Sequence, residues 1–362
     1  MKFKKSELLT VILFCGFILI MALLYLLLPK KEFSENEKRF LPDFPKLAWG
    51  AVAEGEWGED IETYLAEHMP GRDFFVGLNA YFDLVTGRQA SKDIWLKDSK
   101  LIEAPIERSE SSIKANISAI NNFSENIGQN IDLAIVPSAG WSMGLKEYLD
   151  LEIIEEIYSL TCENIDTISL TDIFADSPEL YYSTDHHWTS EGAYLAYCRY
   201  MGHVGRDFTP ASNFTIEIAT GFHGSTFSRS ALWLTPSENI ELWHGNVHIT
   251  AENLETETIN DGPFYYKRLE EADKYTVFLD GNHSIVRVHN PDKEGKLLVI
   301  RDSYSNCLGA FLAESYGEVV LVDPRYYKLP ISELALTEEF DDILICYSIG
   351  NFMTDANICM IR

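Results

Sequence analysis

KLLVIRDSYSNCLGAFLAESYGEVVLVDP, residues 296–324, has the residue pattern of a strand, a turn, a helix and a second strand. Two short apolar runs, 296–300 and 318–322, enclose an apolar segment of helical length. Strands that alternate with helices in this way are typical of a parallel sheet. The same pattern continues further along the chain, where we predict a helix at 331–339 and a strand at 341–352. We therefore predict an α/β fold with a parallel sheet flanked by helices.

The alternation also runs through the earlier chain, from about residue 111. We predict strands at 131–140 and 164–174, and helices at 143–160 and 190–202. Between the two α/β segments, residues 203–295 lack helical periodicity and are rich in turn and aromatic residues. We expect a β-rich insertion there.

Composition divides the chain into three expected parts. Residues 1–30 are predicted to form a cytoplasmic tail and a membrane anchor. Residues 31–110 are predicted to form a polar connector and a helical N-terminal region, which ends in a short hairpin at 93–103. Residues 111–362 are predicted to form the α/β domain, with the insertion at about 203–295.

The predicted anchor is the uncharged run LTVILFCGFILIMALLYLLL at residues 9–28. About 20 apolar residues cross a bilayer, whereas the apolar region of a cleaved signal peptide has roughly 7–15. The run ends in LLPKKEF without a small-residue cleavage site, so we favour an uncleaved anchor over a signal peptide. Lysines lie on both sides of the run, so their distribution leaves its orientation open.

The chain beyond the anchor is strongly acidic. The net charge is −27, and the first 30 residues hold four Lys and one Glu, so the remainder carries −30. Such a surface repels phosphate polymers, and we expect no binding to nucleic acid. Of six cysteines, Cys15 lies in the apolar run, and the others lack the spacing of a zinc site or a redox dithiol. We expect free thiols, no metal and no cofactor.

Ser303 follows the buried strand of the opening stretch and precedes its helix. In an open α/β sheet this position faces the ligand crevice, where the N–H groups at a helix start can stabilise an oxyanion. A serine there can also be an ordinary N-cap. The residue pattern around Ser303 alone leaves both interpretations open.

A second polar block, YYSTDHHWTSEGAYLAY at residues 181–197, precedes another predicted helix. In an extended chain Asp185 and His187 point to one side and His186 to the other, so the Asp185 carboxylate can orient the His187 ring. A serine needs such a base because its hydroxyl is a weak nucleophile. Two other interpretations are a metal site completed by His223 or His283, and a hydrogen-bonded turn that caps the helix.

Several blocks together resemble the bacterial DHHW family, which is related to SGNH-hydrolase-like acetyltransferases of alginate and other exopolysaccharides. The two strongest are TDHHWTSEGAYLAY and LLVIRDSYSNCLGAFLAE. The resemblance extends to ENEKRFLPDFP (35–45), IETYLAEHMPGRDFF (61–75), GFHGS (221–225) and LVDPRYY (321–327). It covers nearly the whole chain after the apolar run.

The resemblance implies a Ser-His-Asp triad of Ser303, His187 and Asp185. Because Asp185 and His187 precede Ser303, it also implies a circularly permuted SGNH-hydrolase-like fold. Asn351, in YSIGNF, matches the family's oxyanion donor, and Asn282 is its rival. Where the family has Gly-Asp-Ser, this chain has Arg301-Asp302-Ser303. Further candidates for substrate binding are Trp188, Arg301, Tyr304, Phe222 and Arg325.

The function that the resemblance implies is a membrane-anchored, extracytoplasmic O-acyltransferase. It would move an acyl group, most readily acetyl, to a hydroxyl of a cell-surface polysaccharide, and it would receive the group from a membrane-bound acyltransferase partner. With water as acceptor, the same residues give an acetyl-polysaccharide esterase. A third possibility is a non-catalytic protein that binds or helps export polysaccharide, stacking sugars on aromatic residues of the insertion: Phe222, Trp233, Trp243, Tyr265 and Tyr266.

Overall fold

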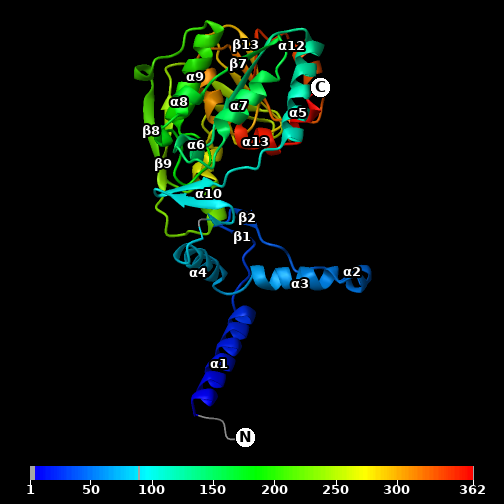
Figure 1. Ribbon diagram of the computed structural model, residues 1–362, viewed down its shortest axis with the longest axis vertical. Helices are drawn as coiled ribbons and strands as arrows, with labels where there is room; N and C mark the ends of the chain where they lie inside the picture. Colours follow the sequence, from blue (N-terminus) through cyan, green and yellow to red (C-terminus); the bar gives the residue numbers. More distant parts are fainter. Residues whose placement is uncertain (1–4, 89, 362) are drawn as a thin grey trace. The chain divides into compact units, whose positions relative to one another are not determined.

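The computed structural model describes residues 5–88 and 90–361, and its contacts divide the chain into two compact units (Figure 1). One unit is the chain up to Ser91 together with residues 228–234, and the other holds residues 92–227 and 235–362. Of the tail predicted before the apolar run, residues 1–4 lie outside the described part, and residues 5–8 belong to the first helix, α1 (Lys5–Leu27). The large unit contains the predicted α/β sheet.

The sheet has eight strands in the order β11-β10-β12-β14-β13-β15-β6-β7. Its five strands from β14 to β7 are mutually parallel, as predicted. These are β14 (Glu318–Val322), β13 (Lys296–Arg301), β15 (Asp342–Ser348), β6 (Ile131–Val136) and β7 (Ile165–Ile168).

Helices cover both faces of the parallel strands, which explains why these strands are continuous apolar runs. Along β13, Leu297 and Val299 join one buried cluster, and Leu298 and Ile300 join the other. The first face is covered by α9 (Ser190–Val204) and α11 (Ser305–Leu312). The second is covered by α5 (Glu110–Ile127), α7 (Asp150–Ser159), α12 (Ile331–Glu338) and α13 (Ile349–Thr354).

The predicted insertion is rich in strands, but it is not a separate layer. Three of its strands extend the main sheet in antiparallel fashion, because β12 pairs with β14 and β10 lies between β12 and β11. Two others form a separate antiparallel pair. The bounds are β8 (Thr215–Phe222), β9 (Glu238–His244), β10 (Thr250–Asn253), β11 (Thr258–Asp261) and β12 (Ile285–His289).

The smaller unit contains α1 (Lys5–Leu27), whose residues 6–27 are long and apolar enough to cross a membrane. The predicted helical region is divided at Pro70–Gly71 into α3 (Glu56–Glu67) and α4 (Arg72–Val85). α4 packs on residues 228–234, where the Trp233 indole N–H donates to the Asp73 carbonyl at 3.0 Å. Its other elements are β1 (Phe33–Ser34), β2 (Arg39–Phe40), α2 (Trp49–Glu54) and β3 (Ala90–Ser91).

Two predicted elements are shorter than the apolar pattern suggested. The helix expected at 143–160 is α7 alone, since a turn separates it from the short helix α6 (Ala139–Ser142). The strand expected at 164–174 ends at Ile168, and a helical turn follows.

The predicted hairpin is β4 (Ile94–Lys97) with β5 (Lys100–Glu103). The remaining elements are α8 (Thr171–Phe174), α10 (Ser225–Ser230), and the 3-10 helices η1 (Pro178–Leu180), η2 (Ala211–Asn213), η3 (Tyr266–Glu270), η4 (Lys274–Val277) and η5 (Ile358–Met360).

Candidate active site

Ser303 lies in the turn between β13 and α11, at the carboxyl end of the parallel strands. The turn is fixed locally, because the Asp302 carboxylate accepts the Tyr304 N–H at 3.0 Å. Ser303 is not the N-cap of α11, which begins two residues later, and its backbone N–H has no partner among the described residues. The side chain is 7% exposed. The N-cap interpretation is therefore wrong for this serine.

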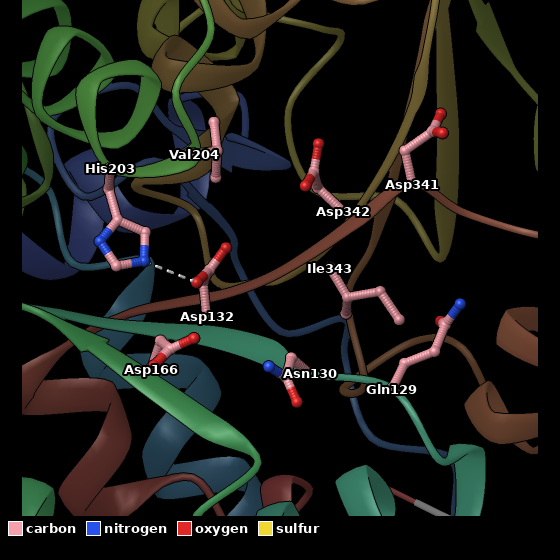
Figure 2. Close-up of a pocket in the computed structure, with 9 residues that line it drawn as sticks. All are labelled: Gln129, Asn130, Asp132, Asp166, His203, Val204, Asp341, Asp342 and Ile343. Carbon is pink, nitrogen blue, oxygen red and sulfur yellow. Dashed lines mark hydrogen bonds and ion pairs between the residues drawn. The ribbon is translucent and has the colours of Figure 1, made fainter.

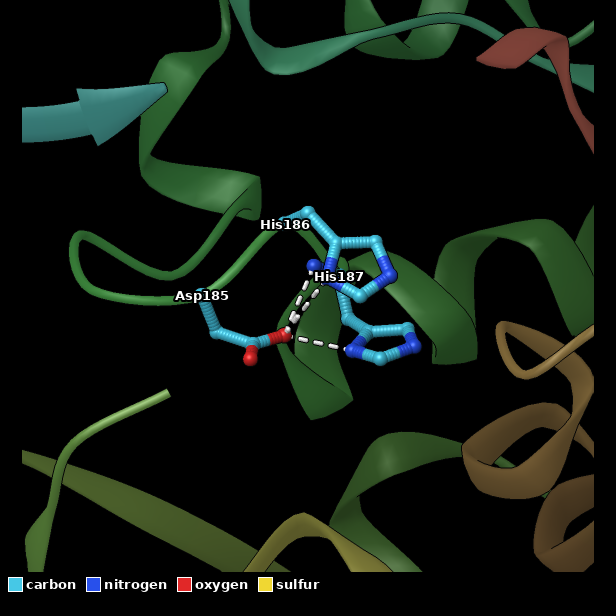
Figure 3. A group of neighbouring side chains, drawn as sticks. All are labelled: Asp185, His186 and His187. Carbon is cyan, nitrogen blue, oxygen red and sulfur yellow. Dashed lines mark hydrogen bonds and ion pairs between the residues drawn. The ribbon is translucent and has the colours of Figure 1, made fainter. Parts of the chain in front are cut away.

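His187 connects Asp185 to Ser303. Its Nδ1 lies 2.5 Å from Asp185 Oδ1 (Figure 3), and its Nε2 lies 2.8 Å from Ser303 Oγ. All three residues are buried. A hydroxyl, an imidazole and a carboxylate are thus in hydrogen-bond contact, which is the geometry needed to activate a serine.

Asp185 and His187 lie together, as strand parity predicted, but the structural reason is different. Residues 183–187 bend instead of running straight. The Asp185 carboxylate accepts the His187 backbone N–H at 2.9 Å, and this local turn brings the two side chains together. His186 also does not face away, because its ring lies beside that of His187 (Figure 3), with 3.8 Å between the two centroids. Its Nδ1 lies 2.6 Å from Ser225 Oγ.

The residues of GFHGS hold the other side of Asp185. The Ser225 backbone N–H donates to Asp185 Oδ2 at 2.6 Å. Gly224 lies so close that a Cβ atom added to it would be 2.1 Å from the Asp185 Cβ. Just before Asp185, the Glu238 carboxylate accepts the backbone N–H groups of Ser183 and Thr184 at 2.7 and 2.6 Å. The loop is therefore fixed from the insertion, more than 35 residues away in sequence.

Burial and charge set the protonation states of the pair. Burial alone would raise the pKa of Asp185, but the charges of His187 and His186, with hydrogen bonds from His187 and the Ser225 N–H, outweigh it and hold this pKa well below its ordinary value. Burial, aided by His186, lowers the pKa of His187 despite the opposing effect of Asp185. His187 is therefore neutral at pH 7 and can accept a proton from the Ser303 hydroxyl.

Two aromatic residues complete the surroundings of His187. The Tyr275 ring stacks on it at 3.8 Å between centroids and 8° between planes. The Trp188 indole donates to the Tyr304 carbonyl at 3.1 Å, which joins the block to the turn that carries Ser303. Sequence reasoning missed Tyr275 and the part played by Ser225, Gly224 and Glu238. The only signal for any of them was the family resemblance of GFHGS.

The two oxyanion candidates differ in their contacts. The Asn351 amide donates to Asp302 Oδ2 at 2.8 Å, and the same oxygen accepts from the Ser348 N–H and hydroxyl. Asn282 is exposed, and its carbonyl oxygen accepts from Arg301 at 3.2 Å and from Asn306 at 3.0 Å. These two donors orient the Asn282 side chain and leave its NH₂ group available.

Most of the candidate substrate-binding side chains lie in the interior. Trp188, Phe222 and Arg301 are 0% exposed and Tyr304 is 4% exposed, so they have no open surface on which a sugar could stack. Arg325 is paired with Asp323 at 2.6 Å. Of the other aromatic candidates, Trp233, Trp243 and Tyr265 are partly buried, and Tyr266 is 46% exposed.

The metal interpretation loses its proposed third ligands. His223 Nε2 bonds the Thr235 carbonyl at 3.0 Å, and His283 lies beside Asp280 and Glu255. Asp185, His186 and His187 do bring ligand atoms within 4.8 Å of one another. However, Asp185 and Ser303 already occupy both ring nitrogens of His187.

A pocket of about 310 Å³ lies at the amino ends of β6, β7 and β15, at the edge of the sheet opposite to Ser303 (Figure 2). It also contains an Asp–His pair, with His203 Nε2 3.0 Å from Asp132 Oδ1. Its other lining residues are Gln129, Asn130, Asp166, Val204, Asp341, Asp342 and Ile343. No serine is among the residues that line it.

Fold and site define an α/β protein with a Ser-His-Asp arrangement at the carboxyl edge of a parallel sheet. The sequence model of the family described as DHHW protein matches residues 151–322, a segment that holds both the Asp-His-His-Trp block and Ser303. The resemblance to the DHHW family is therefore confirmed. No curated protein matches the chain.

Solved structures of similar fold include one described as a DHHW family protein. A DHHW family protein from Eubacterium siraeum is 19% identical, with a TM-score of 0.65 over 75% of this chain and 95% of its own. PatB1 of Bacillus cereus, solved with a sulfonyl adduct, is 19% identical, with a TM-score of 0.62 over 74% of this chain and 98% of its own. At this identity the likeness establishes the fold.

Proposed function

We propose that the protein is a membrane-anchored O-acyltransferase that transfers an acyl group, most readily acetyl, to a hydroxyl of a cell-surface polysaccharide. The observation that carries this proposal is the pair of hydrogen bonds that His187 makes, with Asp185 at 2.5 Å and with Ser303 at 2.8 Å. The resemblance to polysaccharide acetyltransferases supplies the chemical class of the substrates.

In the first half-reaction, Ser303 Oγ attacks the carbonyl carbon of the donor ester while His187 Nε2 takes the hydroxyl proton. The Asp185 carboxylate stabilises the imidazolium that forms. The Ser303 N–H and the Asn282 amide donate to the developing oxyanion, and Asn351 instead positions the turn through Asp302. The tetrahedral intermediate then expels the donor alcohol, which receives the proton from His187 and leaves acyl-Ser303.

In the second half-reaction, His187 takes the proton of a sugar hydroxyl, and the sugar oxygen attacks the acyl carbon. Collapse releases the acylated sugar, and His187 returns the proton to Ser303 Oγ. Water in place of the sugar gives an acetylesterase by the same steps. The alternative that Phe222 and other aromatic residues bind polysaccharide without catalysis is less well supported, because Phe222 is fully buried.

The strand order supports a circularly permuted SGNH-hydrolase-like fold. The parallel strands can be numbered from β13 as the first, followed by β14, β15, β6 and β7. In this numbering they lie side by side in the order 2-1-3-4-5, which is that of a common doubly wound sheet. In the proposed permutation, the first strand of the unpermuted fold is therefore β13, in the carboxyl-terminal part of this chain.

The proposed location is the cell membrane, with α1 as a single uncleaved span and the large unit on the extracytoplasmic side. The length and apolarity of α1 support the span. An extracytoplasmic enzyme needs an acyl group delivered across the membrane, so a membrane-bound acyltransferase is the expected donor partner.

Mass spectrometry tests the proposal directly. The full chain, purified in detergent, is incubated with p-nitrophenyl acetate, quenched in acid and digested. We expect one added acetyl group on the peptide that contains Ser303, and none in the Ser303→Ala variant. Release of p-nitrophenol without acetylation at Ser303 would contradict the nucleophile assignment. Adding an acceptor oligosaccharide separates transfer from hydrolysis, because only transfer yields an acetylated sugar.

A further inference from the structure

α4 has an apolar surface that the proposed active site does not use. Its residues Phe74, Leu78, Phe82 and Val85 are 66%, 55%, 63% and 86% exposed. Because they are spaced by three or four positions, they lie along one side of the helix and form a continuous apolar stripe. Exposed apolar surface of this extent marks a site of interaction.

The opposite side of α4 already has its packing partner. Gly77 and Ala80 are buried, and a Cβ atom on Gly77 would lie 2.8 Å from the Trp233 ring. The Tyr81 hydroxyl accepts the Leu234 N–H at 2.9 Å. The stripe is therefore an outward face of a helix that is held in place, not a core face left without its core.

The start of α4 lies beside the end of α1. Residues 28–31, which follow α1, and residues 67–73, which include the end of α3, the turn after it and the start of α4, line one pocket of about 190 Å³. The stripe begins at Phe74, immediately after this turn. Lys30 and Lys31 are exposed at the same place, where they suit the anionic headgroups of a bilayer.

We infer that α4 is an interfacial helix whose apolar stripe lies in the bilayer surface at the end of the span. The inference rests on the proposed membrane span. The bilayer is the apolar phase already present where α1 ends, and it needs no complementary shape to cover four side chains. The phenylalanines Phe74 and Phe82 suit burial at the boundary between headgroups and acyl chains.

Electron paramagnetic resonance on the full chain tests this seating. A nitroxide is attached at Leu78→Cys or at Phe82→Cys in a Cys15→Ser/Cys359→Ser background, because Cys15 and Cys359 are the exposed cysteines of the described chain. The protein is reconstituted in phosphatidylethanolamine–phosphatidylglycerol vesicles, and collisions with oxygen are compared with collisions with a water-soluble nickel chelate. The background protein gives the signal to subtract. Asn79→Cys is the matched control, since Asn79 is exposed but lies about 100° around the helix from Leu78.

We expect the ratio of oxygen to nickel collisions to be several-fold higher at positions 78 and 82 than at position 79. Equal ratios at all three positions, in protein that floats with the vesicles, would overturn the seating and leave the span intact. Protein that fails to float would overturn both. If the nitroxides at positions 78 and 82 become protected from the nickel chelate only when a membrane-bound acyltransferase is added, the stripe binds a protein partner. That result would overturn the bilayer assignment. Acetylation of Ser303 is measured separately, so the proposed chemistry stands or falls independently.

Discussion

Two Asp–His pairs lie at opposite edges of the same sheet, and the pKa values of their carboxyl groups are shifted in opposite directions. Asp185 has a pKa held well below its ordinary value, whereas burial, only partly offset by His203, raises the pKa of Asp132 to about 6. The difference comes from the neighbours. Asp185 also accepts the N–H groups of His187 and Ser225, but Asp132 is surrounded by the like charges of Asp166 and Asp342.

Two Asp–His pairs of the same composition therefore differ in how readily the carboxylate keeps its charge. A carboxylate that is held by backbone N–H groups and has a lowered pKa stabilises an imidazolium better than one whose pKa is raised by burial and by like charges. Only the pair at the carboxyl edge has a hydroxyl, that of Ser303, within hydrogen-bond distance of the histidine.

Ser303→Ala should lower kcat for p-nitrophenyl acetate by about 10⁴-fold or more, because triad residues act as a unit. The fold should survive, since Ser303 caps no helix and globular domains have roughly 5–15 kcal/mol of stability. Circular dichroism checks the fold of the purified variant. A folded variant that retains wild-type turnover would remove Ser303 from the mechanism.

His187→Ala should lose activity to a similar extent, about 10³- to 10⁴-fold, because no base then takes the serine proton. The matched variant at the other edge is His203→Ala, which breaks the hydrogen bond to Asp132 and should keep nearly full activity. His186→Ala should also retain substantial activity, since its ring contacts Ser225 and not Ser303. Steady-state ester hydrolysis measures all three, and comparable losses at His187 and His203 would refute the contrast.

Gly224→Ala should reduce kcat by about 10²-fold, because a methyl group 2.1 Å from the Asp185 Cβ has to displace the carboxylate, and a shift of about 1 Å costs that much. The Asp132 edge offers the control in Gly202→Ala, where an added Cβ meets nothing within 4 Å. The effect should fall on kcat more than on KM. If both variants behave like wild type, the loop does not need Gly224 to position Asp185.

Asp132→Asn should leave ester turnover unchanged and alter only the pH dependence of stability. The folded pKa of about 6 exceeds the ordinary 3.8, so the native state binds more protons than the unfolded state between these values. The unfolding free energy of the wild type should therefore fall as the pH rises from about 4 to 6, by on the order of 1 kcal/mol for a partly solvated group. Urea unfolding at several pH values should show that this fall between pH 4 and 6 disappears in the variant. If the unfolding free energy of the variant depends on pH as that of the wild type does, the raised pKa is contradicted.

Sequence patterns predicted the parts of the molecule that depend on local signals. The apolar runs of β6, β13, β14 and β15 predicted parallel strands, and the residue pattern around Ser303 predicted the turn between a strand and a helix in which it lies. The contact between Asp185 and Ser225 was not predictable in the same way, because a backbone N–H donor leaves no trace in residue identity. Trp188 and Phe222 show another limit. An aromatic residue beside a polar block fits a binding surface and a core equally well, and only the packing around it distinguishes them.

The position of β15 in the sheet has a consequence for how the chain folds. β15 comes after the other strands of this sheet in sequence, yet it lies between β13 and β6, and its Leu344 pairs with Asp132, about 200 residues earlier. Contacts so distant in sequence make folding slow, because a long loop has to close before they form. Until the carboxyl-terminal segment arrives, one edge of β6 stays unpaired and can join another chain. Refolding from denaturant should therefore be slow, and its yield should fall as protein concentration rises.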